Sequence, residues 1–247
     1  MTLAGLRAWV RLDPMLTVTV ITNANLDTVL NQGALEMNRA AGVLIASGTF
    51  NTVASQQEYV LSGASPQLTG FLDVYWPSGG LVYTQSSGVI KTSPYNFKVV
   101  SPQWLDLNVP AWRTTAASDG IRYAYLSFDA SGNHVLGQYP KPSTTTPSWR
   151  VFFIKKQTDM SADGDYPWVP GTLVAHLEPF HRYIAEYAKW QCHKMITKND
   201  AEADKSFKEY AVGLLMLQDS QLAVFKAELQ GLRLSRSSHA NQSFGGA

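Results

Sequence analysis

The chain has 247 residues, of which 45% are hydrophobic and 16% are charged. This apolar content excludes an intrinsically disordered chain, and a formal net charge of +1 argues against a global basic field that would attract nucleic acid or an anionic membrane. The length fits one large domain or two small ones, either of which can bury a core of its own.

The single cysteine, Cys192, excludes an internal disulfide and a zinc site built from cysteines. The longest apolar runs, such as 18–21 and 151–154, are far shorter than the roughly 18 residues that a membrane-spanning helix needs. Arg7 and Arg11 interrupt the apolar stretch at the N-terminus, which is unlike a signal peptide. We therefore expect a soluble protein made inside the cell.

Two helical patterns begin the chain, at 3–12 and from 23 to about 44. Asp13-Pro14 and a β-branched run at 17–22 separate them. Residues 1–46 are therefore expected to supply the N-terminal helices of a bundle.

Residues 47–156 are rich in Ser, Thr, Gly, Pro, Tyr and Trp, which is typical of strands separated by tight turns. The stretches 77–80 and 129–133 hold glycines and short polar residues and are expected to be hairpin turns. This part of the chain predicts an inserted antiparallel sheet or sandwich. Its strands are expected at 57–62, 70–76, 81–84, 97–100, 122–128, 134–139 and 149–156.

Residues 157–231 change to a helical period, and charge density roughly doubles, with 22 charged residues in 151–247 against 17 in 1–150. Asn199 resembles an N-cap, with Glu202 three residues later. Two long helices are expected here, packed as a C-terminal hairpin. The fold class is thus expected to be α+β, a helical bundle formed from both ends of the chain around an inserted β domain. The apolar positions that indicate the helices are Leu173, Leu177, Phe180, Ile184, Tyr187 and Met195, then Phe207, Tyr210, Leu214, Leu217, Phe225, Leu229 and Leu232.

Residues 232–247 carry no acid and little apolar surface. Such a segment is expected to be an extended C-terminal tail that is ordered only when it docks on a partner.

The chemistry-bearing residues match no common catalytic motif: no phosphate loop, dinucleotide fingerprint, nucleophile elbow or His-Glu-x-x-His is present. His176, His181 and His193 fall on one predicted helix, but their spacing does not place a metal pair on one face. Cys192 is expected to be a buried structural thiol rather than a nucleophile beside His193. We expect no catalytic, cofactor or metal site, and no enzyme activity.

The sequence Asp159-Met160-Ser161-Ala162-Asp163-Gly164 matches the start of a calcium loop. Its twelfth position is Pro170, where calcium needs a carboxylate, so a polar loop is favoured. A cell-wall hydrolase using Asp159, Asp163 and Glu178 has little support, because no motif fixes a carboxylate pair.

Several weak motifs occur in one order along the chain and together resemble the head-to-tail adaptor proteins of tailed bacteriophages, of the tail tubular protein A type. The likeness spans roughly residues 3–217. It is carried by Leu26, Leu30 and Asn31, by Gln-Gln-Glu-Tyr-Val-Leu at 56–61, by Trp104-Leu105, by Gln-Tyr-Pro-Lys-Pro at 138–142 with Val-Phe-Phe-Ile at 151–154, and by His-Arg-Tyr-Ile-Ala-Glu-Tyr-Ala at 181–188 with Asp200, Ala203 and Tyr210.

The resemblance implies a structural virion protein, assembled in the host cytoplasm and located in the neck between head and tail. Such proteins form a homo-oligomeric ring, generally of twelve copies, that joins the portal protein to the tail tube or nozzle protein. Double-stranded DNA passes through the central channel, and the near-zero net charge suits passage without specific binding. No cofactor or membrane is implied.

Two sets of contact residues are expected on this basis. The C-terminal tail is expected to meet the portal through Leu232, Arg233, Leu234, Arg236 and Phe244, and a loop of the β domain to meet the tail through Trp76, Pro77, Ser78 and Gly79. The alternative is a carbohydrate- or receptor-binding phage tail component, whose aromatic-rich sheet holds a sugar.

Overall fold

A computed structural model describes the chain except for residues 62–67, 76–79, 93–95 and 243–247. In the C-terminal helix α5 (Asp200–Gln242), the side chains of 222 and 224–242 also lie outside the described set. The fold is mixed α+β, as predicted, and divides into a helical unit, Met1–Leu44 with Gln157–Ala247, and a β unit, Ile45–Lys156. The sequence pattern had placed these boundaries after 46 and after 156.

Local capping explains where the first two helices begin and end. The hydroxyl of Thr2 accepts from the amide of Gly5, and that of Thr22 accepts from Asn25, so each helix start has an N-cap. Gly42 adopts a left-handed conformation and ends the second helix earlier than predicted. The helical unit contains α1 (Leu3–Arg11), α2 (Asn23–Ala41), the 3-10 turn η2 (Ala175–Phe180), α4 (His181–Cys192), the π-helical turn η3 (His193–Thr197) and α5.

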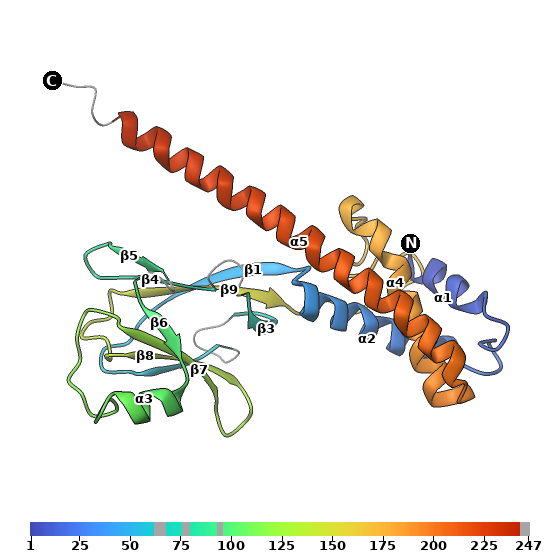
Figure 1. Ribbon diagram of the computed structural model, residues 1–247, viewed down its shortest axis with the longest axis horizontal. Coiled ribbons are helices and arrows are strands. Elements are labelled where there is room, and N and C mark those ends of the chain that lie inside the picture. Colours follow the sequence, from blue (N-terminus) through green and yellow to red (C-terminus); the bar gives the residue numbers. More distant parts are fainter. Residues whose placement is uncertain (62–67, 76–79, 93–95, 243–247) are drawn as a thin grey trace. The chain divides into compact units, whose positions relative to one another are not determined.

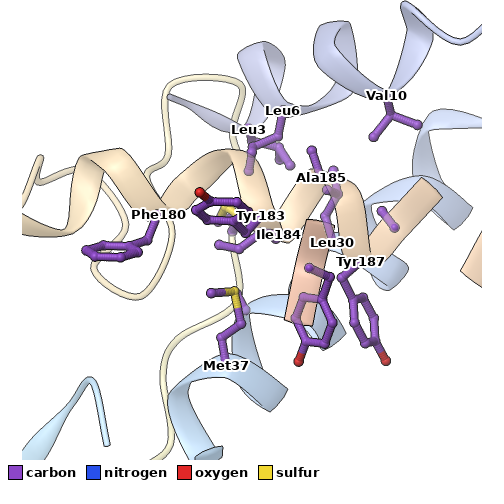
Figure 2. Packing of buried hydrophobic residues seen from close by; sticks show 14 of the residues in the cluster. Leu3, Leu6, Val10, Leu30, Met37, Phe180, Tyr183, Ile184, Ala185 and Tyr187 are labelled. Atoms are coloured by element: carbon purple, nitrogen blue, oxygen red, sulfur yellow. The ribbon is translucent and has the colours of Figure 1, made fainter. Parts of the chain in front are cut away.

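The core of the helical unit forms around α4. Figure 2 shows Leu3, Leu6 and Val10 of α1 on one side of α4, and Leu30 and Met37 of α2 on the other. Helix α5 packs on α2 and α4 through a stripe of buried residues at helical spacing. This stripe contains Ala203, Ser206, Tyr210, Leu217 and Gln221.

The long C-terminal hairpin predicted from the sequence is not seen. Helix α4 has only 12 residues, because Pro179 lies in the 3-10 turn before it and the π-helical turn follows it. Helix α5, in contrast, has 43 residues. The extended tail is a second correction, since α5 continues through 232–242. No proline interrupts this stretch, and adding a residue to an established helix is easier than starting one. Residues 243–247 lie outside the described residues.

The described residues of the β unit form two sheets, in the orders β1-β9-β4-β5 and β2-β8-β7-β6, with β3 also paired to β9 (Figure 1). The predicted strands are found at nearly the expected positions. The strands are β1 (Ile45–Asn51), β2 (Glu58–Val60), β3 (Phe71–Val74), β4 (Leu81–Thr84), β5 (Ile90–Thr92), β6 (Lys98–Val100), β7 (Tyr123–Phe128), β8 (His134–Tyr139) and β9 (Ser148–Lys155). Strands β1 and β5 and the helix α3 (Pro102–Asn108) had no counterpart in the predicted set.

One predicted hairpin turn, 129–133, is confirmed, whereas most of the other, 77–80, lies outside the described residues. Strands β7 and β8 are antiparallel neighbours joined by 129–133, where Gly132 has a φ of 78°. Strands β3 and β4 both pair with β9, at successive positions along it. The predicted antiparallel pairing is found in the described sheets except between β6 and β7, which pair in parallel.

Aromatic residues fill the core of the β unit. Trp149 is fully buried, makes edge contacts with Tyr83 and Phe97, and donates its indole N–H to Oε1 of Gln138 at 2.7 Å. Within the described part of the chain, no helix is long and apolar enough to cross a membrane.

Candidate functional site

The residues predicted to contact the portal and the tail are only partly placed by the structure. Leu232, Arg233, Leu234 and Arg236 belong to α5, in the part whose side chains are not described. Phe244 and the four residues Trp76, Pro77, Ser78 and Gly79 lie outside the described residues. These contacts therefore stay predictions.

The loop that resembled a calcium site is organised by hydrogen bonds within the protein. The carboxylate of Asp165 accepts the amides of Ala162 and Ser161, each at 2.7 Å, and these bonds lower the pKa of Asp165. Asp163 binds Nη1 of Arg7 at 2.5 Å. Among the described residues, no group of three His, Cys, Asp or Glu side chains could hold a metal ion.

Arg7 connects this loop to the first two helices. Its Nε and Nη2 donate to the two carboxylate oxygens of Asp27 at 2.6 and 2.7 Å, while its Nη1 donates to the carboxylate of Asp163. The guanidinium of Arg7 is thus paired with two carboxylates, those of Asp27 and Asp163, and this pairing holds the structure together. The predicted polar loop is therefore held to the α1–α2 pair.

The three histidines of the predicted helix do not meet. His176 is exposed, whereas His181 and His193 are buried and have different neighbours. Burial and the nearby N-terminal charge lower the pKa of His181 to about 4, and its Nδ1 lies 2.7 Å from the amino group of Met1. The Cys192 thiol is buried, as predicted, and burial raises its pKa to about 11.

The feature of the helical unit that sequence reasoning missed is an apolar tip at one end of α4. The tip consists of exposed side chains of the loop after α1 and of the π-helical turn η3. Asp13 joins the two segments by bonding to His193, and Met15 does so by its contact with Asn199. The tip residues are Leu12, Met15, Val18, Val20, Met195 and Ile196.

Two hollows follow α4 away from the tip. The first has a volume of about 610 Å³ and has Leu12, Pro14 and Met15 on its wall. The second, called here the Phe180 groove, has a volume of about 520 Å³ and lies where α4 begins. It is lined by Met1, Trp9, Glu178, Pro179, Phe180, Arg182, Tyr183 and Met216.

Several polar groups along these hollows have partners within the chain. Glu186 accepts from the indole of Trp9 at 2.8 Å and from Lys189 at 2.9 Å. Arg182 donates to the hydroxyl of Tyr183 at 2.5 Å and lies over its ring. The lining of the Phe180 groove is mainly apolar, so this groove offers mainly apolar contact to an incoming surface.

Most aromatic residues of the β unit are in its core rather than on an open face. Trp104 of α3 is the tryptophan of this unit with a partly open ring, 37% exposed, among the described residues. It lies 5.2 Å from the ring of Tyr123. Phe128 of β7 is also exposed and packs on His134, so a sugar-binding platform would rest on these few rings.

Comparison with known proteins adds no identification: no protein-family model matches the chain, and no curated protein sequence matches it.

Proposed function

We propose that this chain is a head-to-tail adaptor, a structural protein of the virion neck in a tailed bacteriophage. It forms a ring, of twelve copies by resemblance, between the portal protein and the tail tube or nozzle protein. The ordered motifs resemble this family, and one structural observation supports the proposal. The helical unit presents two unlike apolar surfaces, the apolar tip and the Phe180 groove, at opposite ends of α4.

A ring of identical subunits needs two different surfaces that fit one another. The 12 residues of α4 place the π-helical turn that carries Met195 and Ile196 roughly 18 Å along the helix from Phe180. In the proposed ring, the tip of one copy enters the Phe180 groove of the next. Repeating this head-to-tail contact closes a ring when the rotation per copy divides the circle.

The remaining parts of the proposal follow the family pattern. Helices α4 and α5 pack laterally against neighbouring subunits. The end of the chain, from Leu232 through Phe244, meets the portal, and the loop 76–79 meets the tail component. Double-stranded DNA passes through the channel without being held, in keeping with the net charge of +1.

Electron microscopy and mass measurement of the full chain, with and without the portal protein of the same virus, test this proposal. We expect rings on the portal for the natural chain. The variant Met195→Glu/Ile196→Glu is expected to stay folded and to form no ring, because a charge at each tip position opposes burial. The matched control Leu107→Glu changes an exposed apolar residue of α3 and is expected to assemble normally.

Two results would contradict the proposal: a chain that does not bind the portal, or a tip variant that forms rings as readily as the control. The alternative, a carbohydrate-binding tail component, is favoured by one observation, the half-open pair of Trp104 and Tyr123. Binding on a glycan array that is lost in Trp104→Ala would support that alternative.

A further inference from the structure

Helix α5 has an outward face that nothing in the described part of the chain covers. Its buried stripe, which includes Tyr210 and Leu217, packs toward α2 and α4. Because each residue turns the helix by about 100°, the opposite side carries Lys208, Val212, Leu215 and Asp219. All four are exposed, with Val212 51% and Leu215 62% accessible. These four residues are called here the α5 seam.

The spacing of the seam is the spacing of a coiled-coil contact. Steps of four, three and four residues keep side chains on the line where two helices meet. The two central positions are apolar, and the outer positions carry opposite charges. Within the described residues, neither Lys208 nor Asp219 has an ion pair or a side-chain hydrogen bond.

We propose that the α5 seam binds the same seam of a second copy, with the two helices antiparallel. In this arrangement Lys208 faces Asp219 of the second copy, and Val212 faces Leu215 of the second copy. The two-fold axis repeats both contacts, so all four charges are paired and all four apolar residues are covered. A parallel pair would instead place Lys208 against its own equivalent, which is repulsive.

The size of the seam sets the strength of the contact. Two apolar residues and two surface ion pairs form a small interface, below the area of a stable dimer. We therefore expect a reversible dimer of the free protein that dissociates on dilution. The seam shares no residue with the apolar tip or the Phe180 groove, so the inference does not depend on the adaptor proposal.

Sedimentation of the full chain across micromolar to submillimolar concentrations tests the pairing. We expect a monomer–dimer equilibrium for the natural chain. The single variants Lys208→Asp and Asp219→Lys each turn two attractive contacts into repulsive ones and are expected to weaken the dimer about tenfold or more. The double variant Lys208→Asp/Asp219→Lys recreates opposite charges across an antiparallel pair and is expected to restore dimerisation.

The matched control exchanges the exposed i, i+3 pair of α2, as Glu36→Arg/Arg39→Glu, and is expected to leave the dimer unchanged. Circular dichroism checks that each variant keeps its helices. A chain that is monomeric at every concentration would overturn the proposal. So would a double variant as weak as the single variants.

Cysteine cross-linking tests the direction of the helices. An antiparallel pair is expected to cross-link Val212→Cys to Leu215→Cys in a mixture of the two variants, because these positions face one another. A parallel pair would cross-link Val212→Cys to itself in preference, and this result would contradict the proposal. The natural Cys192 is buried and does not compete.

Discussion

The carboxylate of Asp13 accepts a hydrogen bond from Nε2 of His193 at 2.8 Å, and the imidazole is fully buried. These residues are 180 positions apart in the sequence. Their bond fixes the loop after α1 to the π-helical turn after α4, and these two segments carry the apolar tip. This bond is thus a buried polar contact that supports the tip.

Asp13→Ala is expected to lower the free energy of unfolding by about 1–3 kcal/mol, because the variant leaves a buried donor of His193 without its acceptor. Urea unfolding followed by circular dichroism measures the change. Asp159→Ala is the control, since Asp159 is exposed and makes no side-chain hydrogen bond among the described residues. The control is expected to change stability by less than about 0.5 kcal/mol. Equal losses in both variants would contradict a supporting role for Asp13.

Gly213→Ala is expected to destabilise the helical unit by about 1–3 kcal/mol, although alanine favours helices more than glycine does. A Cβ atom at Gly213 would lie 2.0 Å from the ring of Tyr183, so α4 and α5 could not keep their separation. Gly5→Ala in α1 is the opposite case. Its nearest neighbour would be 3.6 Å away, and a gain of about 0.5–1 kcal/mol is expected. Thermal unfolding of the two variants side by side distinguishes these signs, and a stabilised Gly213→Ala would show that the helices are not tightly packed there.

The buried His181 is expected to make the helical unit acid-sensitive. Burial and the N-terminal charge hold its pKa at about 4, below the ordinary 6.5, so the unfolded chain binds more protons between these pH values. The free energy of unfolding is thus expected to fall by roughly 2–3 kcal/mol from pH 6.5 to 4, with no contribution from this residue above pH 6.5.

His181→Phe keeps an aromatic ring beside Trp168. This variant is expected to reduce the dependence of the free energy of unfolding on pH between 6.5 and 4. The same replacement at the exposed His176 is the control and is expected to retain the slope of the natural chain. Urea midpoints measured at pH 7, 5.5 and 4.5 supply the comparison. An unchanged slope in His181→Phe would mean that another group causes the acid sensitivity.

Trp149→Phe is expected to destabilise the β unit by about 2–4 kcal/mol. The variant removes the N–H that Oε1 of Gln138 accepts, and it leaves a cavity in the core. Trp104→Phe, at the half-open ring of α3, is expected to cost well under 1 kcal/mol. Calorimetry is the suitable measurement, because two compact units can unfold in separate transitions. The interpretation would be wrong if both variants shifted the same transition equally.

Periodic segments were predictable from the sequence because their local pattern and their burial agree. The start of α2 at Asn23 and the strand β9 were predicted, and β9 lies in the interior of its sheet. Strand β1 escaped prediction because its side chains are exposed or only partly buried and it contains Ser47 and Gly48. Its pairing with β9, more than 100 residues later, creates the strand.

The sequence by itself determined the mixed α+β class, the approximate unit boundaries and the absence of common catalytic motifs, because composition and periodicity are properties of each segment alone. Contacts formed in the folded chain establish which strands share β9, which helix face is covered and where apolar side chains meet. These outcomes depend on contacts between distant residues, such as Asp13 with His193. A tip and a seam are arrangements in space, and spacing within one segment does not encode them.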